Sequence, residues 1–237
     1  GIGDERIDAG AVLAQLRMRK SPQELEHMER AVAIAEAAFR ETQPAIAAGM
    51  RERELAAALV QALHRAGSEP ALPFIPIVAT GPNGADPHHF PGDRRLARGD
   101  LLIIDWGASY HGYFSDITRT FVVAAEPTQE QLAAHLAVRD AARAARATAA
   151  PGIPAGEVDA AARASLSRAG FGEFFVHRTG HGLGLEVHEE PYISQGATVE
   201  LEPGMVFTVE PGVYIPSLGG VRIEDDLLVT ADGSHSL

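Results

Sequence analysis

The sequence predicts an α+β fold built from two similar halves, in which helices cover a sheet. Two observations support this prediction. Apolar residues recur at helical spacing up to residue 66 and again over 128–169, and short continuous apolar runs follow each helical region. The 237 residues can also bury the core of one large domain without requiring a second. We therefore expect a single compact domain.

The helices are predicted from their terminal signals. Ser21 is an N-cap, Pro22 occupies the first helical position and Glu24 completes a capping box, so a long helix begins here. Its apolar face continues to about residue 39. Similar signals predict further helices over residues 51–66, 128–149 and 157–169. We interpret these helices as packing elements rather than as sites.

The strands are predicted from apolar runs that are separated by Gly, Pro and Asp-rich turns. In the first half these runs are residues 74–79, 101–104 and 117–123. In the second half they are residues 205–209, 212–215 and 221–229. Histidines and acids gather at the ends of these runs, which is where a folded sheet would bring them together.

Composition excludes several classes of function. With 20 Lys and Arg against 32 Asp and Glu, the formal charge of -12 would repel nucleic acid and anionic membranes. The chain has no Cys, so a bound metal must rest on His, carboxylate or water. It has neither a long apolar span nor a signal peptide, so we expect a cytoplasmic protein. The start at Gly1 rather than Met suggests an excised domain.

Two aspartates flank a predicted hairpin. Asp105 ends the apolar run 101–104, and Asp116 precedes the next strand after a short loop. For one such Asp a turn role is the simpler interpretation. A hairpin would bring both carboxylates close together, and such a pair needs a proton, a cationic side chain or a metal nearby.

Two histidines lie in a glycine-punctuated segment, Thr179-Gly180-His181-Gly182-Leu183-Gly184, continuing to His188. The glycines around His181 would let the backbone approach an ion or substrate closely. A lone His is usually a hydrogen-bonded side chain, but the second imidazole seven residues later indicates a site. The pattern does not tell which imidazole binds metal.

Two glutamates lie within or after β-like segments. Glu210 follows Phe207-Thr208-Val209, and Glu224 follows Val221-Arg222-Ile223. Strand alternation places Arg222 and Glu224 on one face. Taken alone, this pair would be interpreted as a surface ion pair that contributes little stability.

The acids and His181 together favour a dinuclear metal site. Four carboxylates (Asp105, Asp116, Glu210 and Glu224) and one neutral imidazole carry a formal charge of about -4, which two divalent cations neutralise. Carboxylates bridge metals whereas an imidazole nitrogen binds one, so this set suits two ions that share a water. Mononuclear zinc sites more often use several His or Cys.

At this point the sequence resembles a known family. The segments DWGASYHGYFSDITRT (105–120), HGLGLEVHEEP (181–191), TVEPGVYI (208–215) and VRIEDD (221–226) resemble the catalytic domain of Xaa-Pro aminopeptidases and prolidases. These are relatives of methionine aminopeptidase with the pita-bread fold, which has two pseudo-symmetric halves and a curved, mainly antiparallel sheet covered by helices. The resemblance extends upstream through residues 81–89 to the first helix.

The resemblance implies a role for each matching residue. Asp105 would chelate one metal, His181 and Glu210 would bind the other, and Asp116 and Glu224 would bridge them. His88 would position the substrate, His188 would hydrogen-bond the peptide at the scissile bond, Glu210 would shuttle a proton and Arg222 would support the site. We assign His88 rather than the adjacent His89 because it directly follows Pro87 of the motif.

The resulting hypothesis is a metallo-exopeptidase that cleaves between an N-terminal residue and proline in short peptides. Oxygen-rich ligation favours two Mn²⁺ ions, with Co²⁺ or Zn²⁺ as alternatives. Residues 1–20 would be a remnant of an interdomain linker and residues 21–237 the catalytic domain, and a homodimer is one expected assembly. Methionine aminopeptidase, a creatinase-like C–N hydrolase and a non-catalytic peptide-binding module are the alternatives, because fold does not fix function.

Overall fold

The computed structural model describes residues 9–237. Its helices are α1 (Gly10–Met18), α2 (Pro22–Thr42), α3 (Glu52–Ala66), α4 (Gln129–Thr148) and α5 (Ala155–Arg168), with short 3₁₀ turns at Gln43–Ala45, Gly81–Ala85 and Gly172–Phe174. The sequence did not predict α1, which lies within the proposed linker remnant 1–20; residues 1–8 of that remnant lie outside the described part of the chain. None of the described helices is both long and apolar enough to cross a membrane.

The helix ends follow the predicted signals. The Ser21 side chain accepts a hydrogen bond from the Glu24 N–H, and the Glu24 carboxylate accepts from the Ser21 N–H, so α2 begins with a complete capping box. Thr128 and Gln131 form the same arrangement at α4. Gly67 adopts the left-handed conformation that ends α3. These local signals therefore fixed the boundaries to within a few residues.

The first half of the chain forms a three-stranded antiparallel sheet. Its order is β1 (Ile77–Thr80), β2 (Leu101–Trp106), β5 (Ile117–Val122). The strands β3 (Ser109–Tyr110) and β4 (Tyr113–Phe114) form a small hairpin between β2 and β5. The register places Asp105 opposite Thr118, so the turn between the strands returns Asp116 to the end of the sheet where Asp105 lies. The hairpin predicted from the two aspartates is confirmed.

The second half forms a five-stranded antiparallel sheet and a two-stranded ribbon. The sheet order is β12 (Ser234–Ser236), β11 (Asp225–Val229), β8 (Val206–Val209), β6 (Gly180–Gly182), β7 (Glu189–Ile193). The ribbon pairs β9 (Gly212–Ile215) with β10 (Gly219–Arg222). A bridge between Thr118 and Glu224 joins this half to β5 of the first half. The acids of the two halves therefore meet along one seam.

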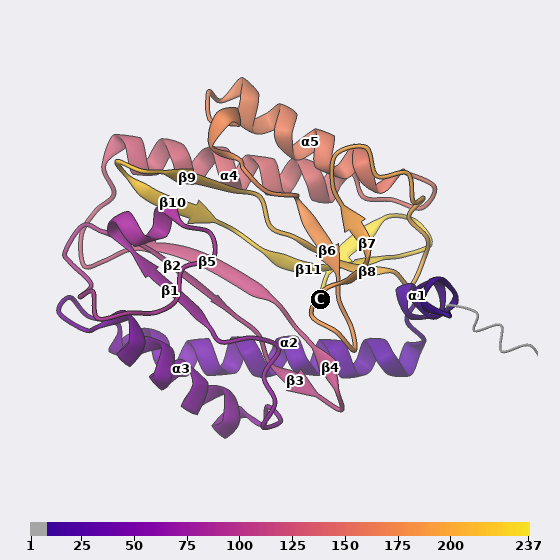
Figure 1. The fold of residues 1–237 in the computed structure, drawn as a ribbon, viewed down its shortest axis with the longest axis horizontal. Helices are drawn as coiled ribbons and strands as arrows, with labels where there is room; N and C mark the ends of the chain where they lie inside the picture. Colours follow the sequence, from indigo (N-terminus) through magenta and orange to yellow (C-terminus); the bar gives the residue numbers. More distant parts are fainter. Residues whose placement is uncertain (1–8) are drawn as a thin grey trace, which may run out of the picture.

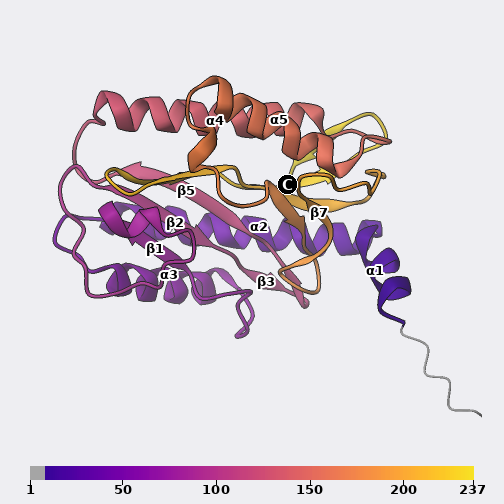
Figure 2. The same cartoon turned by 45° about the horizontal axis from the view of Figure 1, so that its top comes forward.

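Each half has its own hydrophobic core. Helices α2 and α3 pack on β1, β2 and β5 around Leu59, Leu102 and Trp106, all nearly inaccessible to solvent. Helices α4 and α5 pack on strands of the second half around Val138, Leu166 and Phe207. Figures 1 and 2 show the strands between these two helix pairs. The predicted two-half arrangement is confirmed.

Three segments differ from the strand predictions. Residues 221–229 form two strands rather than one, because the chain leaves the ribbon after Arg222 and joins the large sheet at Asp225. In the run 74–79, regular pairing begins only at Ile77, after Pro76. Strands β6 and β7 were not predicted, because glycine and charged residues conceal their apolar character.

Candidate metal centre

A cleft of about 720 Å³ opens where the two halves meet. All of the predicted site residues line it, and they are Asp105, Asp116, His181, Glu210, Glu224, His88, His188 and Arg222. They come from six separate places in the chain, and the two antiparallel sheets bring them together. The remaining wall is largely apolar and includes Phe74, Ile77, Phe90 and Val187.

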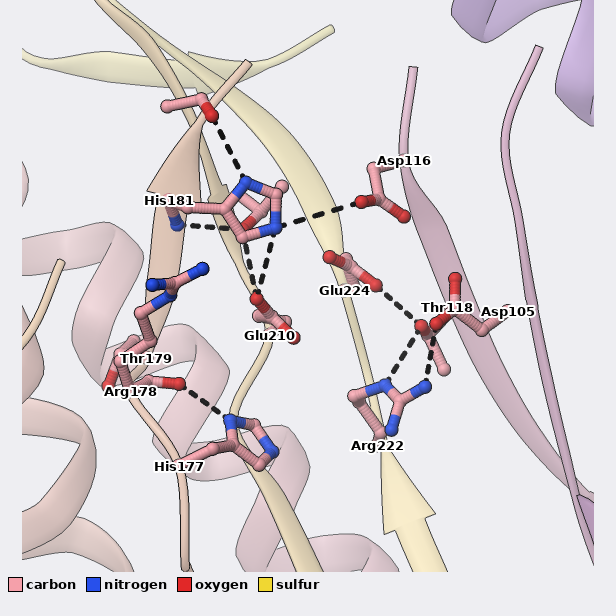
Figure 3. A network of polar contacts seen from close by, with 12 residues as sticks. Asp105, Asp116, Thr118, His177, Arg178, Thr179, His181, Glu210, Arg222 and Glu224 are labelled. Atoms are coloured by element: carbon pink, nitrogen blue, oxygen red, sulfur yellow. Dashed lines mark hydrogen bonds and ion pairs between the residues drawn. The ribbon is translucent and has the colours of Figure 1, made fainter. Parts of the chain in front are cut away.

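The tightest group in the cleft consists of Asp116, His181 and Glu224. Each offers one ligand atom, and these atoms lie within 4.8 Å of one another. His181 Nε2 is 3.8 Å from Asp116 Oδ2 and 3.4 Å from Glu210 Oε1. Figure 3 shows Asp116 and Glu210 facing the His181 ring from the ends of different strands. The structure thus brings together acids that are more than 100 residues apart in sequence.

Burial and mutual repulsion oppose ionisation of these acids. Burial, followed by the charges of Glu224 and Asp105, raises the pKa of Asp116 well above its usual value. Burial and the charges of Glu210 and Asp105 act in the same way on the pKa of Glu224. Burial also raises the pKa of Glu210 to about 7. In the absence of a cation, this cluster is electrostatically unfavourable.

His181 is held in its neutral form. Burial lowers its pKa to about 3, and its Nδ1 lies 3.1 Å from the Gly182 carbonyl. A proton on Nδ1 would be donated to that carbonyl, which leaves the Nε2 lone pair directed at Asp116 and Glu210. The Thr208 hydroxyl accepts a hydrogen bond from the His181 N–H at 3.1 Å and donates to Glu210 Oε1 at 3.3 Å. Strand β8 therefore holds the His181 backbone and Glu210, while the Gly182 carbonyl of β6 orients the ring.

Arg222 does not form the surface ion pair that strand alternation suggested. Its guanidinium is buried and donates to Asp105 Oδ2 at 2.7 Å and to the Tyr214 hydroxyl at 2.8 Å. The Thr118 hydroxyl accepts from Arg222 Nε and donates to Glu224. Arg222 thus orients Asp105 and, through Thr118, Glu224.

His88 and His89 differ in what they contact. His89 Nε2 lies 2.8 Å from the Glu52 carboxylate, which is buried and also accepts from Asn83 and the backbone of Thr80. Asp86 fixes the His88 backbone, but the His88 side chain is exposed in the cleft. This arrangement leaves His88 free to contact a ligand, which supports its assignment in preference to His89.

His188 lies beside His181 but is much more exposed. The two ring centroids are 4.2 Å apart, with the planes at 70°. His188 lines the cleft, and burial followed by the charge of Arg178 lowers its pKa. A neutral, accessible imidazole in this position can donate a hydrogen bond to a bound molecule.

Sequence reasoning missed residues that orient the acids. The buried Asp226 accepts a hydrogen bond from the Asp116 backbone at 3.0 Å, which fixes the start of β5. Thr118 and Tyr214, which contact Arg222, were also missed. So was Arg178, which lines the cleft. The run Glu224-Asp225-Asp226 was the available signal, because alternation along a strand places its first and third acids on the same face.

The glycines around His181 allow two neighbouring strands to approach closely. A Cβ at Gly180 would collide with the Thr208 carbonyl, and one at Gly182 with the Glu190 carbonyl. Both glycines therefore make room for the neighbouring strands β8 and β7. That they also allow close approach to an ion or substrate stays a prediction.

The donor set fits divalent cations. Asp105 Oδ1 and Asp116 Oδ1 are buried and have no hydrogen-bond partner among residues 9–237, which is costly unless a cation satisfies them. The raised pKa values of Asp116, Glu210 and Glu224 indicate unbalanced negative charge. Four carboxylates with one neutral imidazole match oxygen-preferring or borderline ions.

Comparisons with known proteins agree with this description. An Xaa-Pro dipeptidase of Pyrococcus furiosus is 45% identical over 227 residues, covering 95% of this chain and 64% of that protein. The solved structure of the prolidase from the same organism has a TM-score of 0.92 at 43% identity and matches 95% of this chain and 66% of that one. The X-Pro aminopeptidase of Thermotoga maritima has a TM-score of 0.92 at 40% identity, with 95% and 64% covered.

These similarities define the fold as the pita-bread fold of prolidases and X-Pro aminopeptidases. Residues 26–231 match metallopeptidase family M24. The chain belongs to this family. It spans 64% of the length of the curated Xaa-Pro dipeptidases that it matches.

Proposed function

We propose that this chain is the catalytic domain of a metallo-exopeptidase that hydrolyses the bond between an N-terminal residue and proline. The observation that carries the proposal is the buried cluster of Asp105, Asp116, Glu210 and Glu224 around neutral His181. One oxygen each of Asp105 and Asp116 has no hydrogen-bond partner in the part of the chain that the structure describes. Its relatives include proteins named Xaa-Pro dipeptidase and X-Pro aminopeptidase. Membership of the metallopeptidase family supports the same class of reaction.

The proposed ligands are those that the sequence predicted. Asp105 would hold one ion, His181 and Glu210 the other, and Asp116 and Glu224 both. We propose Mn²⁺ because the donors are mainly carboxylate oxygens. Two divalent ions held by this set would supply acidification of a water molecule and polarisation of the scissile carbonyl.

The protein groups would bind the peptide and handle the proton. Glu210 Oε1, near His181 and 16% exposed as a side chain, would accept a proton from water and return it to the leaving nitrogen. His188 and His88 would donate hydrogen bonds to oxygens on which negative charge develops. Arg222 would act through Asp105 and Thr118 by fixing their orientation.

The alternatives have specific weaknesses. Methionine aminopeptidase shares the ligand set, but TVEPGVYI and the short interval from Glu210 to Glu224 resemble the Xaa-Pro group more closely. A non-catalytic binding module would have no use for a complete set of metal ligands, yet all five are present and clustered. Creatinase-like hydrolysis remains a distinct chemical outcome for the assay below.

A substrate panel tests the proposal. The Mn²⁺-loaded protein is assayed on Xaa-Pro dipeptides, Xaa-Pro tripeptides, a Met-Ala peptide and creatine. We expect hydrolysis of Xaa-Pro substrates and no hydrolysis of creatine. Cleavage restricted to the Met-Ala peptide or to creatine would overturn the assignment, and no cleavage of any member would favour the binding module.

A further inference from the structure

A loop between β6 and β7 carries His188 to the cleft. Strand β6 ends at Gly182, and β7 begins at Glu189, which pairs with Gly182. Residues 183–188 between them have no regular secondary structure, and His188 is the last of them. The direction of the His188 ring therefore depends on how this loop is held.

A buried ion pair holds the end of the loop. Lys20 Nζ donates to Glu189 Oε1 at 2.7 Å, and the two side chains are only 1% and 8% exposed. The other carboxylate oxygen of Glu189 is buried and has no hydrogen-bond partner within the described residues. Successive side chains of an extended segment point to opposite sides, so a fixed Glu189 also sets the direction of its neighbour His188, which lines the cleft.

Lys20 approaches Glu189 from a backbone that is itself held in place. It lies between α1 and α2, and its N–H donates to the Gly204 carbonyl at 2.8 Å. The preceding residue, Arg19, forms a β-bridge with Met205. Helix α1 packs beside β7 (Figure 1). The ammonium group is therefore a fixed point against which the loop can be positioned.

The loop packs closely on this ion pair. A Cβ at Gly184 would lie 2.8 Å from Glu189 Oε1 and 3.0 Å from Lys20 Cε. The Gly184 carbonyl accepts a hydrogen bond from the Phe114 N–H at 2.9 Å, which holds the opposite side of the loop against β4. A shift of Glu189 away from Lys20 would thus disturb the loop as well as the start of β7.

The energetics of a buried ion pair favour a positioning role. Desolvation of both charges offsets much of their attraction, so the intact pair adds little net stability. Removing one partner leaves an unpaired buried charge, which is costly. Glu189 can reach water only if the segment that carries His188 moves. The pair therefore holds one conformation of this segment.

We propose that Lys20 is a positioning residue for the reaction, and that it holds His188 in place through Glu189. The proposal rests on the proposed Xaa-Pro function, in which His188 contacts the peptide, and it adds a residue that lies outside the cleft. It also makes the end of the predicted linker remnant, residues 1–20, a working part of the catalytic domain.

A double-mutant cycle tests the proposal. We would measure kcat, KM and metal content on Leu-Pro for the Mn²⁺-loaded wild type, Lys20→Met, His188→Ala and the double variant. Lys20→Met removes the charge and should lower kcat about 10-fold or more at wild-type metal content, because misplacing a group by about 1 Å can cost up to about 100-fold. In the His188→Ala background it should change kcat less than about 2-fold, because the group that it positions is gone. Lys20→Arg should retain part of the activity.

Hydrogen exchange measures the loop directly and needs no substrate. In the Mn²⁺-loaded protein, Lys20→Met should speed exchange of the amides in residues 183–189 about 10-fold or more, with β2 unchanged. Glu189→Gln breaks the same pair from the other side and should give the same result.

Arg19→Met is the matched control for both measurements. It removes the neighbouring charge, whose ion pair with Glu202 has side chains 57% and 50% exposed. Exposed pairs contribute little, so its kcat, KM and loop exchange should equal those of the wild type.

Three outcomes would overturn the proposal. Losses that multiply in the double variant would mean that Lys20 acts independently of His188. Unchanged kcat and loop exchange in Lys20→Met would show that the loop does not need the ion pair. Faster exchange throughout the domain would give the pair a general structural role. If Lys20→Met does not fold, Glu189→Gln takes its place in the cycle. Failure of the proposed function is a separate result, because the wild type would then leave Leu-Pro intact while exchange still decides whether Lys20 holds the loop.

Discussion

His181 and His188 are adjacent imidazoles with different surroundings. His181 is 3% exposed and its Nδ1 contacts the Gly182 carbonyl, so its Nε2 faces the acids. His188 is exposed in the cleft, with its ring centroid 4.2 Å from that of His181. A metal ligand has to be deprotonated and fixed in place, whereas a substrate contact has to be accessible. We therefore expect the two residues to have separable effects.

Replacing each histidine with alanine tests this separation. His188→Ala should lower kcat on an Xaa-Pro substrate about 100-fold while metal content stays at the wild-type value, because a hydrogen bond to the transition state is lost. His181→Ala should lose metal as well as activity, because water fills the ligand position at best. Metal content and turnover are measured at matched free Mn²⁺. The reverse pattern would mean that the two roles are exchanged.

At the residue scale, the sequence predicted which side chains gather in the cleft but not how they are oriented. The acids and histidines were recognisable because they occur where apolar runs end, and the motif resemblance gave them roles. Asp226, Thr118 and Arg178 act through contacts with residues up to 110 positions away. The acidic run 224–226 was a local signal for Asp226. No local pattern records the contacts of Thr118 and Arg178, so only the folded chain identifies those two residues.

At the element scale, β6 is confined between two strands. It pairs with β7 and β8, and Gly180 and Gly182 lie against the Thr208 and Glu190 carbonyls. Both are backbone carbonyls, and they cannot move aside as the end of a flexible side chain could. Because Gly180 and Gly182 have no side chains, β6 fits between β7 and β8 and places His181 between the acids of both halves.

Adding a methyl group to β6 should separate its neighbours. We expect Gly180→Ala to lower the free energy of unfolding by at least about 2 kcal/mol, because overpacking against backbone forces strand displacement. That corresponds to a fall in melting temperature of about 5 °C or more for a domain of this size. The metal-free protein is used, so that ligand binding does not mask the change.

Gly92→Ala is the matched control for this variant. The nearest atom to a Cβ at Gly92 is Glu52 Oε2 at 3.6 Å, an ordinary van der Waals contact. Its melting temperature should stay within about 2 °C of the wild type, since substitutions without a structural conflict change stability little. Equal melting temperatures for Gly180→Ala and the wild type would show that β8 can move aside.

The elements themselves differ in how much their own sequence specifies them. The capping boxes at Ser21 and Thr128 are complete within a few residues, so the starts of α2 and α4 were predicted closely. Strand β6 is three residues with two glycines, and nothing in that segment favours an extended conformation. Pairing with β7 and β8 creates it, which is why sequence analysis missed it.

At the scale of the whole molecule, the proposed metal centre connects two halves that have separate cores. Asp105 and Asp116 belong to the first half, and His181, Glu210 and Glu224 to the second. The alternation of helical and apolar segments predicted this division. The closeness of the two sets could not be predicted from periodicity, because it depends on how β5 meets the segment between β10 and β11.

Metal stoichiometry tests the shared site. We expect about two equivalents of divalent metal per chain at saturation, because four carboxylates carry the charge that two dications balance. Elemental analysis after gel filtration and calorimetric titration with Mn²⁺ give the number independently. One equivalent accompanied by full activity would contradict a dinuclear centre.

Metal removal should lower the melting temperature, because the carboxylates of the two halves then repel one another. Ions that bind only the folded state add stability by mass action, about 2.7 kcal/mol at a concentration 100 times the dissociation constant. A chelator should therefore lower the melting temperature by about 5–10 °C, and Mn²⁺ should restore it. An unchanged melting curve under both conditions would argue against a metal centre at the seam.

Glu224→Gln separates this repulsion from other effects of the chelator. Burial and the charges of Glu210 and Asp105 raise the pKa of Glu224, so an ionised Glu224 destabilises the metal-free fold. The amide keeps an oxygen to accept the Thr118 hydrogen bond but carries no charge.

With chelator present at pH 8, the variant should therefore melt higher than the wild type. With Mn²⁺ present the order should reverse, because the wild type keeps a carboxylate ligand that the variant lacks. Differential scanning calorimetry of both proteins under both conditions measures whether the order of their melting temperatures reverses. If the variant melted lower under both conditions, the charge of Glu224 would not destabilise the metal-free fold, and repulsion within the acidic cluster would not be what metal relieves.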